Sequence, residues 1–227
     1  MLSVRNMQFR YPHSTFELNV PRFDLEVGQH TAIVGPSGCG KTTFLNLLSG
    51  IIPLTAPSAG EVKFQNVVLP TAKSNEMRRF RNDSIGIVFQ DFRLIEYLSL
   101  KDNILLPVTL SSRTQDDDWE RRADVLIRKV GLEGISDRPV SSMSRGEQQR
   151  VAVCRALLRR PTLVLADEPT ANLDSENATD VLDLLFDQAN EIDATVVAVT
   201  HADESLSRFP RVLPFREINT GGNDSPA

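Results

Sequence analysis

The segment 35–42 constrains the fold more than any other part of this 227-residue chain. Its residues fit the pattern G-x-x-x-x-G-K-[ST], and they are Gly35, Pro36, Ser37, Gly38, Cys39, Gly40, Lys41 and Thr42. The apolar run His30–Val34 precedes it and is typical of a buried strand, whereas Lys41–Ser49 is typical of a helix. A strand, a glycine-rich loop and a helix in this order predict an α/β fold.

The chemistry of this loop is that of a phosphate-binding site. Its glycines let the backbone curl, so that successive N–H groups point at phosphate oxygens. Lys41 carries a positive charge to the β- and γ-phosphates, and Thr42 offers a hydroxyl group to Mg²⁺. The helix that continues through Thr43 adds its positive dipole end. For Cys39 two interpretations stand, a reactive thiol near a helix N-terminus and a small residue that fills the loop, and we favour the second.

A second signal is an apolar strand that ends in two acids. Leu163–Ala166 is followed directly by Asp167 and Glu168. Because α/β folds bind ligands at the carboxyl ends of their strands, Asp167 is placed to hold Mg²⁺, directly or through water. Glu168 points elsewhere and can polarise a water molecule for in-line attack on the γ-phosphate. Considered without the phosphate loop, the same residues are also consistent with a strand that is followed by an acidic turn of no catalytic role.

Two further polar side chains follow apolar strands in the same way. His201 comes directly after Thr195–Thr200, and Gln90 ends Ile85–Phe89. We interpret His201 as a candidate for contact with the γ-phosphate. The amide oxygen of Gln90 is a candidate to coordinate Mg²⁺ or to position water. A structural histidine and an ordinary polar strand end are the alternatives.

Of the four strand candidates, Ile85–Phe89, Leu163–Ala166 and Thr195–Thr200 are nearly unbroken apolar runs, which predicts strands of a mostly parallel sheet. Helix-like stretches alternate with them, and beyond the phosphate loop they are Trp119–Val130, Glu147–Arg160 and Glu176–Asn190. The alternation predicts an α/β fold of the phosphate-loop NTPase type.

Other parts of the chain differ from this core. The first 30 residues and Gly60–Leu69 predict short strands of a small antiparallel sheet. Residues from about 91 to 144 contain helical segments without a central strand, and we interpret them as an inserted helical subdomain. We therefore expect a single domain over residues 1–218, followed by a disordered tail at 219–227 that is rich in Gly, Asn, Ser and Pro.

Composition bears on the class of function and on the cellular setting. The net charge of −5 argues against nucleic acid as the main partner, because phosphate backbones select basic surfaces. Two cysteines do not suggest a disulfide framework, and the N-terminus lacks a signal-peptide layout, so we expect a reduced, cytoplasmic setting. No run of 18 apolar residues exists. If the protein works at a membrane, another chain supplies the membrane part.

The segment Ser142–Arg150 resembles the signature of ABC-transporter ATP-binding proteins, usually LSGGQ or LSGGE followed by QQR. Gln90 then corresponds to the Q-loop, Ala171–Asp174 to the D-loop and His201 to the switch histidine. Tyr11 stands where this family stacks an aromatic ring on adenine, although a tyrosine on a sheet surface is the alternative. The motifs occur in the family's order from Tyr11 to His201, which is most of the chain.

The resemblance implies an ATPase that uses ATP and Mg²⁺ and dimerises with a second copy of itself. In such a dimer Ser144, Gly146 and Glu147 face the γ-phosphate of the opposite subunit's ATP, at a helix N-terminus that suits an anion. Ser144 and Glu147 also fit the helix-capping pattern S-x-x-E, and both interpretations can hold at once. The family further implies an integral membrane permease as partner, and a peripheral location on the cytoplasmic face of the membrane.

Arg145 is the largest departure from the family, because it replaces the first signature glycine. Met143 replaces leucine, which is a mild change. An arginine cannot adopt a positive φ without strain, so we expect an ordinary backbone here. The guanidinium either reaches a phosphate of the opposite nucleotide or points outward to an acid, and we favour the outward orientation.

Within the family, Ile87–Leu94 and Asn103–Val108 resemble the subgroup of lipoprotein-releasing, macrolide-exporting and cell-division ATPases. Apolar residues crowd the segment after Gln90, and they are Phe92, Leu94, Ile95, Tyr97 and Leu98. They form either subdomain core or a docking groove for a permease helix. Three functions remain open: an ATPase that drives transport, an ATPase of a transmembrane signalling complex, and a soluble ABC ATPase that acts on nucleic acid or ribosomes.

Overall fold

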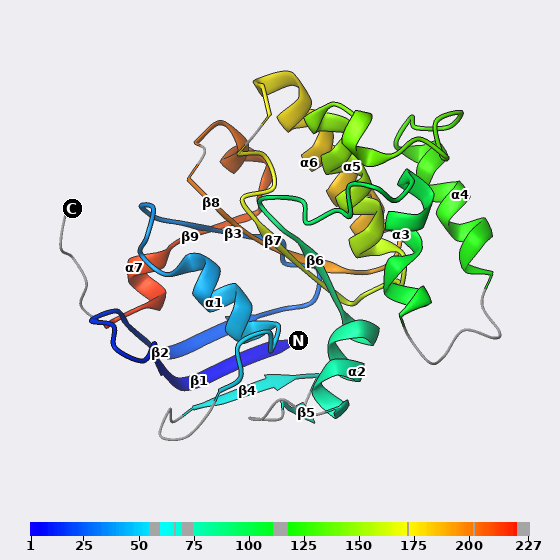
Figure 1. Ribbon diagram of the computed structural model, residues 1–227. Helices are drawn as coiled ribbons and strands as arrows, with labels where there is room; N and C mark the ends of the chain where they lie inside the picture. Colours follow the sequence, from blue (N-terminus) through cyan, green and yellow to red (C-terminus); the bar gives the residue numbers. More distant parts are fainter. Residues whose placement is uncertain are drawn as a thin grey trace.

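The computed structural model describes residues 1–54, 60–65, 67–69, 75–110, 118–171, 173–201 and 203–221. Two sheets and a group of helices make up the molecule (Figure 1). The strands are β1 Leu2–Arg10, β2 Glu17–Leu25, β3 Thr31–Val34, β4 Glu61–Phe64, β5 Val67–Val68, β6 Ile85–Val88, β7 Leu163–Asp167, β8 Thr195–Thr200 and β9 Arg211–Pro214. The α-helices are α1 Lys41–Leu48, α2 Asn75–Ser84, α3 Leu100–Thr109, α4 Trp119–Lys129, α5 Arg145–Leu157, α6 Ser175–Asn190 and α7 Phe215–Ile218, and the 3₁₀ turns are η1 Val140–Ser142 and η2 Asp203–Arg208.

The parallel sheet predicted from the apolar runs is confirmed, with strand order β6-β7-β8-β3-β9. In its register Val34 pairs with Thr200, and Asp167 pairs with Val199. The carboxyl ends of β3, β7 and β8 therefore meet at one edge of the sheet. This register is what brings the loop after β3 beside the acids that end β7.

The predicted strand ends shift by single residues for local reasons. Strand β3 begins at Thr31, because the His30 backbone closes a turn onto the Gly28 carbonyl (3.0 Å) and its ring accepts the Val196 N–H. Strand β6 ends at Val88, and Phe89 accepts the Phe92 N–H across a turn. Strand β9 is a short edge strand that the apolar pattern does not reveal; it ends in proline, as edge strands tolerate.

The antiparallel sheet is also confirmed, with order β2-β1-β4-β5. Its strands β1 and β2 are nine residues each, longer than the short strands expected. They pair from Leu2 opposite Leu25 to Arg10 opposite Glu17, and buried side chains alternate along both. One face can therefore pack on the core while the other stays in solvent.

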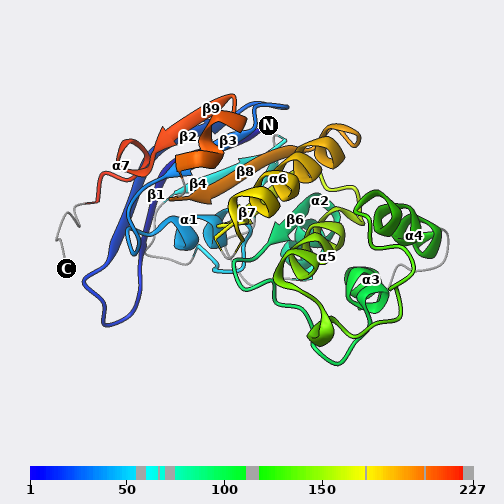
Figure 2. The same ribbon diagram turned by 90° about the horizontal axis from the view of Figure 1, so that it is seen from above.

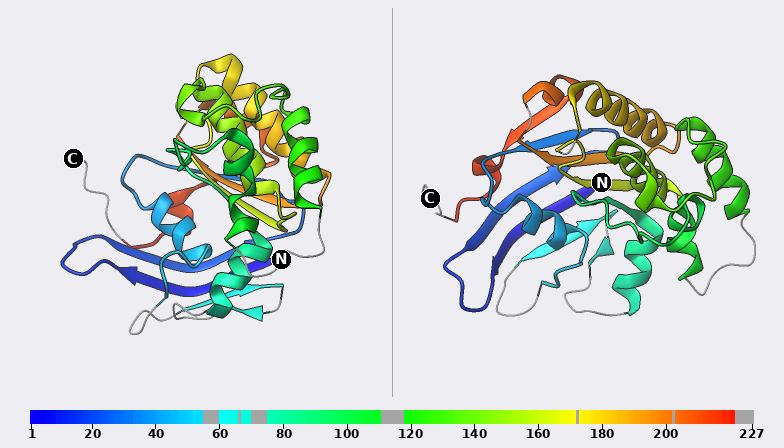
Figure 3. Two further views of the ribbon diagram at one scale, coloured as in Figure 1. Left: turned by 45° about the vertical axis from the view of Figure 1, so that its right-hand side comes forward. Right: turned by 45° about the horizontal axis from the view of Figure 1, so that its top comes forward.

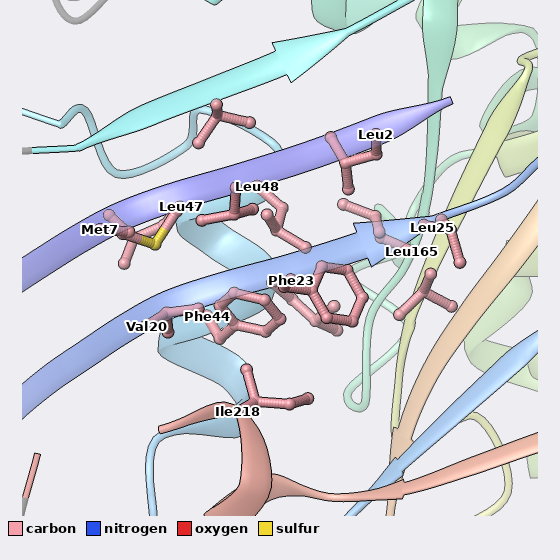
Figure 4. Close-up of a cluster of buried hydrophobic side chains, with 14 of the residues drawn as sticks. Leu2, Met7, Val20, Phe23, Leu25, Phe44, Leu47, Leu48, Leu165 and Ile218 are labelled. Carbon is pink, nitrogen blue, oxygen red and sulfur yellow. The ribbon is translucent and has the colours of Figure 1, made fainter. Parts of the chain in front are cut away.

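Helix α1 packs between the two sheets and forms the centre of the core. Its side chains Phe44, Leu47 and Leu48 lie against β1 and β2 on one side and against Leu165 of β7 on the other (Figure 4). On the opposite face of the parallel sheet, α5 and α6 bury a second apolar cluster. Burial of the α1 side chains fixes the phosphate loop, since this loop runs directly into α1.

Helices α3 and α4 lie at the end of the molecule away from the β1–β2 hairpin, in all views (Figures 1, 2 and 3). They share an apolar cluster with α5, to which Val151, Cys154 and Leu158 contribute. Helix α5 starts at Arg145, two residues before the predicted start, because Ser144 caps it. Helix α5 therefore belongs both to this helical group and to the layer over the sheet.

The segment after α7 contacts β2. The Asn219 amide oxygen accepts the Asn19 N–H (2.8 Å), and the Thr220 N–H donates to the Asn19 carbonyl (2.8 Å). Residues 219–221 of the expected tail are thus attached to the antiparallel sheet, whereas 222–227 lie outside the described residues.

Candidate active site

A cavity of about 550 Å³ opens at the carboxyl edge of the parallel sheet. Residues from five parts of the chain line it: the β1–β2 hairpin, the glycine-rich loop with the start of α1, and the segments after β6, β7 and β8. The lining residues are Tyr11, Phe16, Ser37, Gly38, Gly40, Lys41, Thr42, Thr43, Gln90, Glu168 and His201. All of them except Phe16 were expected at the site from sequence.

The glycine-rich loop needs its glycines at two positions. Gly38 has φ of 78° and Gly40 has φ of 107°, a left-handed region that disfavours other residues. A Cβ on Gly40 would also lie 2.6 Å from the Phe16 ring, whereas one on Gly38 would meet nothing within 4 Å. Gly40 is the N-cap of α1, and no side chain caps this helix. The first-turn N–H groups of α1 are thus available to an anion.

Lys41 is folded back onto its own loop. Its ammonium group donates to the carbonyls of Gly35 (2.7 Å) and Pro36 (2.9 Å), and the residue is only 5% exposed. These two hydrogen bonds hold a buried cation in place beside the cavity. The charge is therefore positioned before any phosphate enters.

Thr42 and Asp167 meet across the site. The Thr42 hydroxyl donates to Oδ1 of Asp167 at 3.0 Å. Burial raises the pKa of the Asp167 carboxyl above its ordinary value, and the hydrogen bond from Thr42 opposes this rise. Charge repulsion from Glu168 raises the pKa of Asp167 further. A single proton or a bound cation would relieve this repulsion between carboxylates.

The oxygen donors suit Mg²⁺. A hydroxyl, a carboxylate and the Gln90 amide offer hard oxygen ligands, and the described residues contain no cluster of three or more His, Cys, Asp or Glu able to hold a metal by themselves. Mg²⁺ is usually held by one or two such protein ligands together with substrate phosphates. The donor set therefore fits a metal that arrives with a nucleotide.

Glu168 and His201 form a pair. Nδ1 of His201 lies 2.8 Å from Oε2 of Glu168, with the histidine side chain 54% exposed and the glutamate side chain 12% exposed. Glu168 has φ of 46°, and its N–H donates to the Val199 carbonyl. The Glu168 carboxylate thus contacts His201, while that of Asp167 contacts Thr42. The sequence placed both residues at strand ends but gave no sign that they contact each other.

Tyr11 and Phe16 form an aromatic wall on the hairpin side. The Tyr11 hydroxyl lies 3.3 Å from the Thr43 hydroxyl, and the Tyr11 ring packs edge-on against Phe9. Phe16 lies 6.1 Å from Tyr11 between ring centroids. Sequence reasoning missed Phe16, since its position beside Gly40 depends on how the hairpin folds over the loop.

The structure does not place every expected residue in this cavity. Gly35, Pro36 and Cys39 line a separate cavity of about 590 Å³ on another side of the loop, together with Phe215 and Asn219. Cys39 is partly buried there, and its thiol would lie 3.2 Å from a Cβ on Gly35. The loop thus presents Ser37, Gly38 and Gly40 to the first cavity and its remaining residues elsewhere.

Ser144, Gly146 and Glu147 are also absent from the lining, because they lie at the start of α5, which both views draw apart from α1 (Figures 1 and 2). Ser144 and Glu147 form a complete capping box: the Ser144 N–H donates to the Glu147 carboxylate (2.7 Å), and the Glu147 N–H donates to the Ser144 hydroxyl (3.3 Å). The Ser144 N–H holds the pKa of Glu147 below its ordinary value. The capping pattern expected from sequence is confirmed.

Arg145 is exposed in the first turn of α5 and has ordinary helical backbone, as expected. Within the part of the chain that the structure describes, its side chain forms no ion pair. The D-loop segment is only partly visible, because Asn172 lies outside the described residues. Leu173 closes a turn onto Thr170, and Asp174 caps α6.

These features define an α/β phosphate-loop NTPase fold with a cavity at the carboxyl edge of the sheet. Residues 18–171 match the family model described as ABC transporter. The chain belongs to the ABC transporter family, and it is an ATP-binding ATPase of that family.

Relatives with curated sequences agree with this assignment. The chain is 40% identical over 219 residues to the lipoprotein-releasing system ATP-binding protein LolD 1 of Rhodopirellula baltica, covering 93% of this chain and 94% of that protein. It is also 40% identical over 209 residues to the uncharacterized ABC transporter ATP-binding protein YvcR of Bacillus subtilis, covering 88% and 79%.

Solved structures agree as well. The ATP-binding cassette MJ0796, in a dimeric post-hydrolysis state bound to ADP and Pi, superposes with a TM-score of 0.83 at 30% identity and covers 99% of this chain and 97% of that one. CbiO1 of Clostridium perfringens, part of the ABC transporter complex cbiONQ, gives a TM-score of 0.75 at 29% identity over 88% and 78%. None of the helices in the described ranges is long and apolar enough to cross a bilayer.

Proposed function

We propose that two copies of this chain bind two ATP molecules between them, hydrolyse them with Mg²⁺, and so drive a separate integral membrane permease. The observation that supports this most is the position of two side-chain pairs at one cavity, which Thr42, Glu168 and His201 line and which Asp167 approaches through its hydrogen bond with Thr42. Thr42 with Asp167 offers a metal site, and Glu168 with His201 offers a base with a partner, both beside the phosphate loop.

In this proposal each part of the cavity has a separate task. Tyr11 and Phe16 hold the adenine ring by stacking. The N–H groups of the loop and of α1 bind the β- and γ-phosphates, and Lys41 neutralises their charge at a shielded position. The hydrogen bonds of Lys41 to its loop are exchanged for phosphate oxygens when ATP enters.

Thr42, Asp167 and Gln90 would hold Mg²⁺. When bound, the ion supplies positive charge that offsets the charge developing on the phosphate oxygens. Glu168 accepts a proton from the attacking water, in line with the bond that breaks between the γ-phosphorus and the bridging oxygen. His201 holds the Glu168 carboxylate in place and contacts the γ-phosphate from the exposed side of the cavity.

The second copy supplies the other wall of the site. The cavity is open and lacks any group from α5, whereas at the N-terminus of that helix Ser144 is exposed, Glu147 is partly buried and Gly146 is buried. The cassette MJ0796 is dimeric. We infer that these residues of one copy approach the γ-phosphate bound by the other.

The permease contact is proposed at the segment after Gln90. Phe92 is buried and belongs to the core, whereas Tyr97 is 83% exposed and Ile95 and Leu98 are half-buried. An exposed tyrosine flanked by apolar residues suits a protein interface. CbiO1 is part of a transporter complex, and LolD 1 is named for lipoprotein release, which supports a membrane partner and a peripheral place on the cytoplasmic face.

Glu168→Gln tests the dimer and the base together. The variant keeps the shape of the side chain but removes its negative charge. We therefore expect it to bind Mg-ATP, to hydrolyse ATP at least about 100-fold more slowly than wild type, and to accumulate as a dimer. Light scattering with and without Mg-ATP measures the mass. A variant that binds ATP but stays monomeric would count against the shared site.

A signalling complex that moves no cargo remains the second candidate, because the same ATPase cycle serves both. Co-purification with a candidate integral membrane partner, followed by a transport assay in vesicles, distinguishes them. Tyr97→Ala should reduce co-purification without lowering the melting temperature. An equal loss of stability would instead assign Tyr97 to the fold.

A further inference from the structure

Helix α5 contacts two turns at the edge of the cavity, in addition to carrying Ser144 at its start. The Gln90 turn (Phe89–Arg93) follows β6, and the Glu168 turn (Glu168–Ala171) follows β7. Arg155 of α5 donates to the carbonyls of Phe92 (2.5 Å) and Arg93 (2.6 Å) in the first turn. Gln149 of α5 donates through Nε2 to the Pro169 carbonyl (2.7 Å) in the second.

Arg155 is an unusual residue to bury. It is 9% exposed, and burial lowers its pKa to about 10. Within the described residues no Asp or Glu forms an ion pair with it, so its positive charge is stabilised by hydrogen bonds to backbone carbonyls. A buried cation without a carboxylate is costly, and an apolar side chain of the same length would fill the same space. The guanidinium therefore does something that packing alone would not require.

What Arg155 holds is a strained turn. Phe92 and Arg93 are consecutive residues with φ of 57° and 49°, a conformation that persists only where the surroundings enforce it. The Arg93 side chain lies over the Phe89 ring, 4.5 Å from its centroid. Because the Gln90 side chain leaves the chain between these anchored residues, the bonds from Arg155 fix where Gln90 can reach.

Gln149 performs the same task on the neighbouring turn. It is buried, it donates to the residue directly after Glu168, and its own Oε1 has no hydrogen-bond partner among the described residues. Glu168 has φ of 46°, so this turn too departs from ordinary backbone. The turns are adjacent, since Val88 pairs with Ala166. One helix thus fixes both turns that bring polar side chains to the cavity.

We propose that Arg155 and Gln149 are positioning residues for ATP hydrolysis. Through them, contact at the N-terminus of α5 is transmitted to Gln90 and Glu168 of the same chain, so that a nucleotide held by the second copy aligns the water-activating groups here. This rests on the proposed function, which assigns Gln90 and Glu168 their roles.

The test compares two positioning variants with two matched controls in the purified full chain. Arg155→Gln is matched by Arg122→Gln, because Arg122 also donates to two carbonyls, those of Leu158 and Leu157, at the far end of α5. Gln149→Leu is matched by Gln148→Leu, because Gln148 donates to Val140 and Met143 carbonyls instead. Turnover, ATP affinity and melting temperature are measured for all four.

We expect Arg155→Gln and Gln149→Leu each to lower kcat by roughly 10-fold or more, since small misplacements of reacting groups have effects of this size. The ATP affinity stays within about 2-fold, because the phosphate loop is untouched. The two controls lose comparable stability but keep kcat. Arg155→Lys, which keeps the charge with fewer donors, restores part of kcat and covers the case in which Arg155→Gln does not fold.

A double-mutant cycle gives the decisive readout. If Arg155 acts through the Gln90 turn, the fold-change from Arg155→Gln shrinks when Gln90→Ala is already present. If the fold-changes of Arg155→Gln and Gln90→Ala simply multiply in the double variant, Arg155 does not act through the Gln90 turn. An unchanged kcat in both Arg155→Gln and Gln149→Leu overturns the whole proposal. Failure of the proposed function is a different result: wild-type hydrolysis that survives Lys41→Ala.

Discussion

The N-termini of α1 and α5 face phosphate in the proposed dimer, but they are built in opposite ways. Helix α1 starts at Gly40, which has a left-handed backbone and caps the helix with no side chain. Helix α5 starts at Ser144, whose capping box pairs the Glu147 N–H with the Ser144 hydroxyl and the Ser144 N–H with the Glu147 carboxylate. The box leaves out the N–H groups of Arg145 and Gly146. The start of α1 has no side-chain cap, and the start of α5 is partly capped by its own residues.

This difference suggests separate roles for the two helices: the start of α1 binds ATP, and the start of α5 completes the ATP site of the second copy. The open end of α1, with Lys41 held beside it, can bind ATP in a single copy. The capped end of α5 offers the groups that its capping box does not use, which are the N–H groups of Arg145 and Gly146, the Ser144 hydroxyl proton and the helix dipole. We therefore expect one chain alone to bind nucleotide through α1, and α5 to contribute only when the second copy brings a phosphate to it.

The largest effect should come from Lys41→Ala, which removes the charge at the open end. We expect the ATPase rate to fall by a factor of roughly 10²–10³ or more, because a preorganised cation at developing charge is lost. Phosphate release by the purified variant measures this. Near-normal hydrolysis by Lys41→Ala would mean that the start of α1 does not bind the phosphates, and the phosphate-loop assignment would be wrong.

Next come paired glycine substitutions at the two ends. Gly40→Ala forces a Cβ to 2.6 Å from Phe16 in a backbone with φ of 107°, so we expect a cost of about 1–3 kcal/mol or more and weak ATP binding. Gly146→Ala places its Cβ 3.0 Å from the Asn177 side chain, while the helix gains about 1 kcal/mol in propensity.

The Gly146→Ala monomer should therefore keep its melting temperature and ATP affinity, and only ATP-dependent dimerisation should fall. Thermal melts, nucleotide titration and light scattering separate these outcomes. If Gly40→Ala were as mild as Gly146→Ala for the monomer, the two helix starts would not differ as the structure indicates.

The capping box gives a smaller effect with a defined pH dependence. Ser144→Ala and Glu147→Gln should each cost about 1 kcal/mol, or roughly 2–4 °C in melting temperature, at neutral pH. Because the pKa of Glu147 is lowered in the folded chain, the stability from its carboxylate is present above the ordinary glutamate pKa and is lost as pH falls through the lowered value.

The deficit of Glu147→Gln relative to wild type should consequently shrink as the pH falls below about 4. Melting curves of both proteins from pH 7 downward test this. A deficit that stays constant over this range would mean that the carboxylate charge does not stabilise the start of α5.

The smallest effect is expected at Arg145. An exposed cation in the first turn of a helix opposes the helix dipole, so Arg145→Glu should stabilise the monomer by about 0.3–1 kcal/mol. If the Arg145 guanidinium points outward, Arg145→Gly and Arg145→Glu should both leave ATP-dependent dimerisation within a few-fold of wild type. Loss of dimerisation in Arg145→Glu, with ATP binding intact in the monomer, would show that the guanidinium faces the nucleotide.

The elements predicted best are those set by local pattern. The strand before the phosphate loop, the acids after β7 and the cap at Ser144 each depend on a few adjacent residues, and all three are confirmed. The prediction was wrong on lengths set by pairing, as in the nine-residue strands of the β1–β2 hairpin. It also missed β9, a short edge strand that ends in proline.

The sequence by itself determined which residue types stand at the carboxyl ends of the strands, because the end of each apolar run marks where its strand ends. Only the tertiary structure decided which of them touch. Phe16 reaches Gly40, His201 pairs with Glu168, and Arg155 bonds the turn at Phe92. These contacts join segments far apart in the chain, so they depend on strand register and helix packing, which no local pattern encodes.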